Sequence, residues 1–139
     1  MKIPGVKLKK LKIINNPKGN IYKYISKKDS IFKKFGEVYF SEIFKGKVKG
    51  WNLHKKNTCI ICVPSGKVKF VLLSNEKKFF IKEKKMKVIL SKKKHIALII
   101  PPNIWFSFTS ITKTSLVANF LNNPHSKKEV LKKPTKSKF

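Results

Sequence analysis

The residues with the clearest chemical potential lie between Gly46 and Gly66, in the stretch GKVKGWNLHKKNTCIICVPSG. His54 could act as a general base, because an imidazole gains and loses a proton near neutral pH. The alternative is a histidine that only hydrogen-bonds inside the protein, and the sequence alone favours that alternative. Lys49 could bind a diphosphate, although a lysine in so basic a chain is more often a solvated surface residue.

Cys59 and Cys62 form a C-x-x-C pair, a spacing that binds zinc or performs redox chemistry in other proteins. Here the pair falls in a predicted strand, where residues three apart point to opposite faces. The chain has no further cysteine, so a second half of a zinc site is missing. We therefore interpret both as small buried residues, without a disulfide framework, which suits a reducing cytoplasm.

Four aromatic residues could line a binding pocket or stack on a flat ligand: Trp51, Trp105, Phe106 and Phe108. The alternative for each is packing in the protein core, which we expect for at least half of them. His95 and His125 have no partner that their spacing would reveal, so we expect both at the surface.

Short apolar runs and period-two alternation predict strands as the elements that position these residues. The expected strands are Lys7–Ile14, Asn20–Ile25, Glu37–Phe44, Lys47–His54, Asn57–Val63, Lys67–Leu73, Lys78–Lys82, Met86–Leu90, Ile96–Ile100, Trp105–Thr109 and Ser115–Leu121. A single helical turn could form within Ser26–Phe35. Strands this short and regular predict an all-β sandwich or barrel.

The length of 139 residues suits one domain, which we place at residues 1–131, followed by a basic and flexible tail at 132–139. No apolar run approaches the roughly 20 residues that a membrane-spanning helix needs. The N-terminus lacks the apolar segment of a signal peptide. We expect a cytoplasmic protein without a membrane partner.

The net charge of +28 comes from 34 basic residues, all lysine, against 6 acidic ones. Such a charge could attract nucleic acid or another polyanion. Two features make that reading less favoured. The chain lacks arginine, which makes the bidentate contacts to guanine and phosphate, and its lysines are spread along the whole sequence.

The spacing in two stretches resembles the two sequence motifs of a cupin barrel. In the first, Gly46 is followed by Asn52-Leu53-His54, then Cys59, then Gly66, at the intervals of the cupin Gly, His-x-His, acid and Gly. The second is Ile100–Phe108 (IPPNIWFSF). Within the cupins, the chain is most similar to the dTDP-4-dehydrorhamnose 3,5-epimerase family from about Ile3 to Glu129. The resemblance implies an RmlC-like cupin, a double-stranded β-helix or jelly-roll barrel, that forms a homodimer.

The resemblance also implies where the family's functional residues fall in this sequence. The arginine position holds Lys49, the histidine base position holds Asn52, and the position of the enolate-stabilising lysine holds Cys59. The tyrosine falls near Ala118, and the acid that supports the histidine lies beyond Glu129, where the chain has no Asp or Glu. His54 is then the candidate substitute base.

The candidate substrate-binding residues are Lys49, Asn52, Cys59, Trp105 and Phe106. Of the three histidines and one acid that a metal-binding cupin uses, His54 alone is present, so we predict no metal, and we expect no cofactor.

Two hypotheses follow. The first is an epimerase-like or isomerase-like protein of surface polysaccharide synthesis that binds a nucleotide-linked sugar. The second is a non-catalytic cupin that binds a nucleotide sugar, or a polyanion through its lysine-rich surface.

Overall fold

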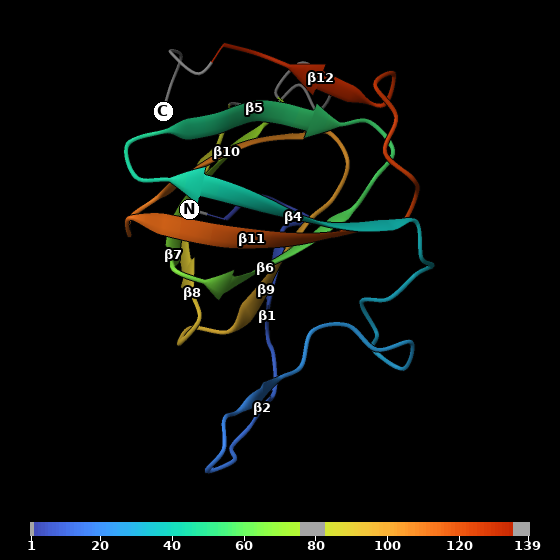
Figure 1. The fold of residues 1–139 in the computed structure, drawn as a ribbon. Coiled ribbons are helices and arrows are strands. Elements are labelled where there is room, and N and C mark those ends of the chain that lie inside the picture. The colour runs from blue at the N-terminus through green and yellow to red at the C-terminus, as the bar shows by residue number, and fades with distance from the viewer. Residues whose placement is uncertain (1, 76–82, 135–139) are drawn as a thin grey trace.

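A computed structural model describes residues 2–75 and 83–134 of the chain. These residues form two five-stranded sheets that face each other, and a two-stranded hairpin (Figure 1). All neighbouring strands are antiparallel. The described residues contain no helix, and therefore no helix that could span a membrane. The all-β prediction is confirmed.

The order of strands in each sheet decides which side chains meet. The first sheet contains β1 (Lys7–Lys10), β9 (Ile96–Ile100), β6 (Cys59–Ser65), β11 (Thr114–Leu121) and β4 (Glu37–Phe44), in that order. The second contains β12 (Val130–Lys132), β5 (Val48–His54), β10 (Ile104–Ser110), β7 (Lys67–Ser74) and β8 (Lys85–Ser91). The hairpin consists of β2 (Ile13–Ile14) and β3 (Ile21–Tyr22), and β2 projects away from the two sheets in Figure 1.

The main core lies between the two sheets and follows strand alternation. In β6, Cys59 and Ile61 point into this core, whereas Ile60 and Cys62 point to the outer face of the first sheet. The two cysteines therefore lie on opposite faces, as their spacing predicts. Burial raises the pKa of each thiol to about 12, so both stay protonated.

The outer face of the first sheet is covered by the segment that follows β3. Tyr24, Ile25, Ile31 and Phe32 of this segment pack against the outer apolar residues of the sheet. The expected helical turn does not form there. Instead, two consecutive turns occur. In the first, the amide of Asp29 donates to the carbonyl oxygen of Ser26, and in the second, the amide of Phe32 donates to the carbonyl oxygen of Asp29.

Most predicted strands lie close to the observed ones. β4 and β9 have the predicted bounds, whereas the expected strand Lys7–Ile14 is divided into β1 and β2. The predicted strand Lys78–Lys82 lies outside the described residues. β12 was not predicted, and its Lys132, the first residue of the expected tail, pairs with Asn52 of β5. Residues 135–139 of that tail lie outside the described part of the chain.

Candidate functional site

A cavity of about 100 Å³ opens between the two sheets, on the side of β4 and β5. Its lining combines polar groups with an apolar floor. The lining residues are Tyr39, Ser41, Lys49, Asn52, His54, Ile61, Phe106, Phe108, Val117 and Asn119. The first sheet supplies one wall through β4, β6 and β11, and the second sheet supplies the other through β5 and β10.

An irregularity in β5 brings three polar side chains to the same wall. Lys49 and Asn52 are three residues apart, so regular alternation would place them on opposite faces. The register between β5 and β10 shifts here, with Asn52 opposite Phe106 and Lys49 opposite Phe108. The shift is a β-bulge, and it lets Lys49, Asn52 and His54 all line the cavity.

Gly50 lies inside this bulge, in a conformation that favours glycine. Its φ is +119°, and a Cβ atom there would lie 2.7 Å from Cβ of Ser107 and 2.8 Å from the carbonyl oxygen of Phe106. A side chain at this position would push β5 and β10 apart. The glycine is therefore required for the bulge that gathers the polar wall.

His54 forms a buried pair with Glu129. Its Nδ1 lies 2.8 Å from Oε2 and 3.2 Å from Oε1 of Glu129, and both side chains are less than 10% exposed. The backbone amides of Asn57 and Lys56 also donate to the carboxylate, at 2.7 Å and 3.2 Å. When Nδ1–H donates to Glu129, Nε2 is the basic nitrogen of the ring.

The surroundings of Glu129 favour its charged form. Burial opposes ionisation, but the hydrogen bonds from the Asn57 amide and from His54 outweigh it and lower the pKa of Glu129. The resemblance placed the acid that supports the histidine beyond Glu129, whereas in the structure Glu129 itself pairs with His54. One signal pointed to it: between residue 84 and the C-terminus, Glu129 is the only acidic residue in the sequence.

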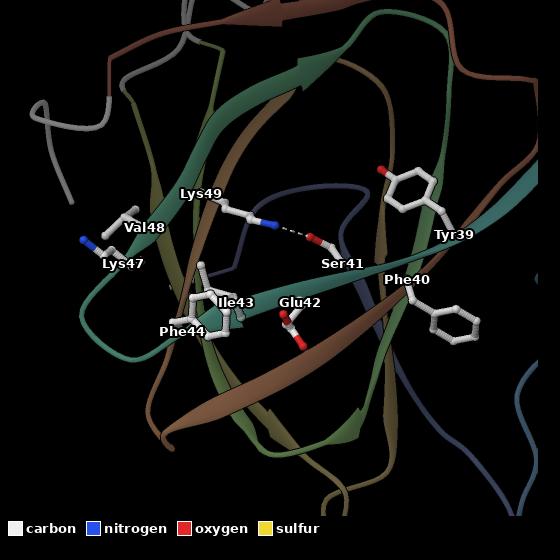
Figure 2. Close-up of a pocket in the computed structure, with 9 residues that line it drawn as sticks. All are labelled: Tyr39, Phe40, Ser41, Glu42, Ile43, Phe44, Lys47, Val48 and Lys49. Carbon is white, nitrogen blue, oxygen red and sulfur yellow. Dashed lines mark hydrogen bonds between the residues drawn. The ribbon is translucent and has the colours of Figure 1, made fainter.

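Lys49 extends the site towards solvent. Its Nζ donates to Oγ of Ser41 at 2.9 Å, which bridges β5 and β4 across the opening, as Figure 2 shows. A groove of about 640 Å³ continues outward from here, lined by residues 39–44 of β4 and by Lys47, Val48 and Lys49. Tyr39, Ser41 and Lys49 line both hollows, so the cavity and the groove adjoin each other.

The structure brings together four of the six residues predicted for the site: Lys49, Asn52, His54 and Phe106 all line the cavity. The Phe106 ring stacks beside His54, with centroids 6.1 Å apart and planes 13° apart. Cys59 is fully buried in the same core but does not line the cavity.

Trp105 lies on the other face of its strand. It packs there with Trp51 and Leu53 on the outer side of the second sheet, and Nζ of Lys133 lies 4.4 Å from its ring centroid. Trp105 therefore does not line the cavity, because neighbouring residues of a strand point to opposite sides.

The other two histidines lie outside the cavity. His125 is exposed, as expected. The surface expectation for His95 is wrong: it is 6% exposed, its Nε2 lies 2.5 Å from the carbonyl oxygen of Lys23, and its ring contacts Tyr22 edge-on. His95 thus joins the N-terminal segment to the sheet. Within residues 2–75 and 83–134, no three His, Cys, Asp or Glu side chains gather as metal ligands would.

Three polar lining residues were missed by the sequence reasoning: Tyr39, Ser41 and Asn119. Tyr39 and Ser41 alternate with exposed residues of β4, and Asn119 interrupts an apolar strand. A polar residue in the inward register of a strand is the signal that could have identified them.

Comparisons with known proteins agree with this architecture. The family model described as WxcM-like, C-terminal, matches residues 4–137. A dTDP sugar isomerase from Desulfovibrio desulfuricans G20 is 29% identical, with a TM-score of 0.92 over 97% of this chain and 87% of that chain. A search of curated proteins finds no significant match.

Two further solved structures share the fold at lower identity. The 3,4-ketoisomerase QdtA from Thermoanaerobacterium thermosaccharolyticum, a mutant in complex with TDP-4-keto-6-deoxyglucose, is 21% identical, with a TM-score of 0.79 over 94% of this chain and 88% of that one. The dTDP-4-dehydrorhamnose 3,5-epimerase from Sulfolobus tokodaii is 24% identical, with a TM-score of 0.85 over 95% and 78%. The chain has the RmlC-like cupin fold and belongs to the WxcM-like, C-terminal family.

Proposed function

We propose that the protein is a nucleotide-sugar isomerase that acts on a dTDP-linked 4-keto-6-deoxy sugar. The observation that carries this proposal is the buried pair of His54 and Glu129 at a cavity between the sheets. The family match and the likeness to a dTDP sugar isomerase support the class of substrate.

The size and charge of the two hollows fit such a substrate. A cavity of about 100 Å³ is too small for a whole nucleotide, since sites for ligands of that size hold several hundred Å³. The sugar ring would occupy the cavity, and the nucleotide would extend into the groove of about 640 Å³. Lys47 and Lys49 would face the diphosphate there, and the exposed Phe40 and Phe44 offer apolar rings to the base.

The chemistry proposed for His54 is proton transfer next to a ketone. Nε2 takes the proton from C3 of the 4-keto sugar, and the C4 oxygen takes a proton from water, which gives an enediol. Return of the proton from His54 to C4, with release of the proton on the C3 oxygen to water, gives the 3-keto sugar. Glu129 accepts the hydrogen bond from Nδ1–H and so holds His54 in the tautomer whose Nε2 is free to take the proton.

Isomerisation is preferred to epimerisation because it needs one base on one face of the sugar. Asn52, which stands at the family's usual base position, has an amide that does not accept a proton at neutral pH.

The test is proton NMR of dTDP-4-keto-6-deoxyglucose with the protein in D₂O. An isomerase will form the 3-keto product, in which the C3 proton signal is lost and C4 carries deuterium wherever the proton held by His54 has exchanged with the solvent. His54→Gln should slow this about 10²- to 10⁴-fold, the usual contribution of a general base. His125→Gln, an exposed histidine, should match the wild type.

Unchanged exchange in His54→Gln would exclude His54 as the base. Exchange at C5 together with C3 would identify an epimerase instead. Broadened ligand signals without exchange would identify a binding protein that has lost the reaction.

A further inference from the structure

Asn119 carries a buried polar atom that the protein does not satisfy. The residue lies on β11, is 4% exposed and lines the cavity. Within the described part of the chain, no group hydrogen-bonds to its Oδ1. An acceptor left unpaired in this way is unfavourable, so such an atom on a residue that lines a cavity is suited to accept a hydrogen bond from a ligand.

Tyr39 stands beside Asn119 on the neighbouring strand. The two residues are direct cross-strand partners of β4 and β11, and Nδ2 of Asn119 donates to Oη of Tyr39 at 3.0 Å. Because the phenol oxygen already accepts this bond, its own O–H is free to donate. Burial raises the pKa of Tyr39, which keeps that proton in place at neutral pH.

Both residues line the cavity, so its wall on this side contains one unpaired acceptor and one donor next to each other. They belong to the first sheet, whereas His54 belongs to the second, so a ligand in the cavity lies between them and the base.

We propose that Asn119 and Tyr39 recognise the two adjacent oxygens of an α-hydroxyketone in the sugar. Oδ1 of Asn119 accepts a hydrogen bond from the hydroxyl, and Oη of Tyr39 donates one to the ketone oxygen. This assignment rests on the proposed function and adds to it the chemical feature that the cavity selects. A 4-keto sugar with a free C3 hydroxyl has this feature, whereas the nucleotide alone does not.

The pair also has a role in the proposed reaction. The C4 oxygen becomes more negative as His54 removes the C3 proton, and a hydrogen bond from a neutral phenol strengthens as that charge develops. Substitution of Tyr39 should therefore affect the sugar end of the substrate and leave the nucleotide end unchanged.

The experiment compares two ligands by isothermal titration calorimetry: dTDP and dTDP-4-keto-6-deoxyglucose. Tyr39→Phe and Asn119→Ala should each weaken binding of the keto sugar nucleotide about 3- to 30-fold, the value of one lost hydrogen bond at a buried site. Binding of dTDP should change less than about twofold, since dTDP lacks the hydroxyketone that forms these two hydrogen bonds. Thermal unfolding checks that both variants fold.

Tyr24→Phe is the matched control. Tyr24 lies on the outer side of the same sheet, where its hydroxyl donates to the carbonyl oxygens of Ile60 and Ala118. Its loss should lower stability and leave the ratio of the two affinities at the wild-type value.

The outcomes separate this inference from the proposed function. If the wild type binds the keto sugar nucleotide and both Tyr39→Phe and Asn119→Ala keep its affinity ratio, the recognition pair is wrong and the proposed function stands. An equal loss of affinity for both ligands in these variants would also exclude Asn119 and Tyr39 as the groups that recognise the hydroxyketone. If the wild type binds neither ligand, both proposals fail together.

Discussion

Glu129 accepts hydrogen bonds from three groups, the imidazole of His54 and the backbone amides of Lys56 and Asn57. These bonds hold its pKa below the ordinary value of 4.5. A carboxylate with a lowered pKa stabilises the folded state above its ordinary pKa, and this contribution is lost as the pH falls through the lowered pKa. The acid stability of the protein should therefore depend on this residue.

Glu129→Gln should lower the free energy of unfolding at neutral pH. The difference from the wild type should stay constant above about pH 5 and shrink as the pH falls below the ordinary carboxyl pKa. Urea unfolding at a series of pH values measures it. Glu42→Gln removes the same charge from an exposed site and should keep the wild-type pH dependence. A difference that does not vary with pH would show that the charge of Glu129 contributes nothing to the fold.

At the scale of elements, the bulge in β5 determines which residues reach the cavity. It depends on Gly50, where a Cβ atom would lie within 2.8 Å of the β10 backbone. Gly50→Ala should destabilise the protein by at least about 2 kcal/mol, from the clash and the positive φ together. It should also reduce ligand binding, because Lys49 and Asn52 depend on the shifted register.

Gly46→Ala separates the cost of the positive φ from the cost of the clash. Gly46 also has a positive φ of 82°, but no atom lies within 4 Å of a Cβ placed there. Its substitution should cost only about 1 kcal/mol, the strain of the backbone without the clash. Chemical denaturation of both variants measures the difference, and equal costs would show that the approach of β10 does not constrain Gly50.

The same bulge marks the limit of what the sequence could predict. The motif spacing placed Asn52 and His54 on one strand, and most strand bounds followed from alternation. Alternation does not reveal a bulge, so the common orientation of Lys49 and Asn52 followed only from the resemblance. Trp105 and Phe106 were both assigned to the site, although adjacent strand residues cannot share a face. Glu129 was missed because β12 is three residues long and carries no clear pattern.

At the scale of the whole molecule, the charge of +28 separates the two functional hypotheses. A nucleotide sugar touches a few lysines at one groove, whereas a polymer would neutralise many at once. Raising the salt from about 0.05 M to about 0.5 M should weaken binding of dTDP less than about tenfold. Affinity for a single-stranded oligonucleotide should fall by several powers of ten, since each neutralised phosphate adds to the salt dependence.

Fluorescence anisotropy with a labelled dTDP analogue and a labelled oligonucleotide measures how steeply each affinity falls as the salt concentration rises. If the affinity for dTDP falls as steeply with salt as the affinity for the oligonucleotide, the nucleotide binds the diffuse surface charge. The nucleotide-sugar proposal would then lose its support from the groove.

The pairing of β12 with β5 links the site to the late steps of folding. His54 and Glu129 are separated by 75 positions in the chain, and they meet when Val130 aligns with His54 in the sheet. Contacts of such long sequence separation form late, because the intervening chain must first be ordered. The pairs of β1 with β9 and of β4 with β11 span similar separations, so the barrel and the acid partner of its proposed base are expected to be completed in the same late step, and catalytic competence should appear together with the gain of β-structure.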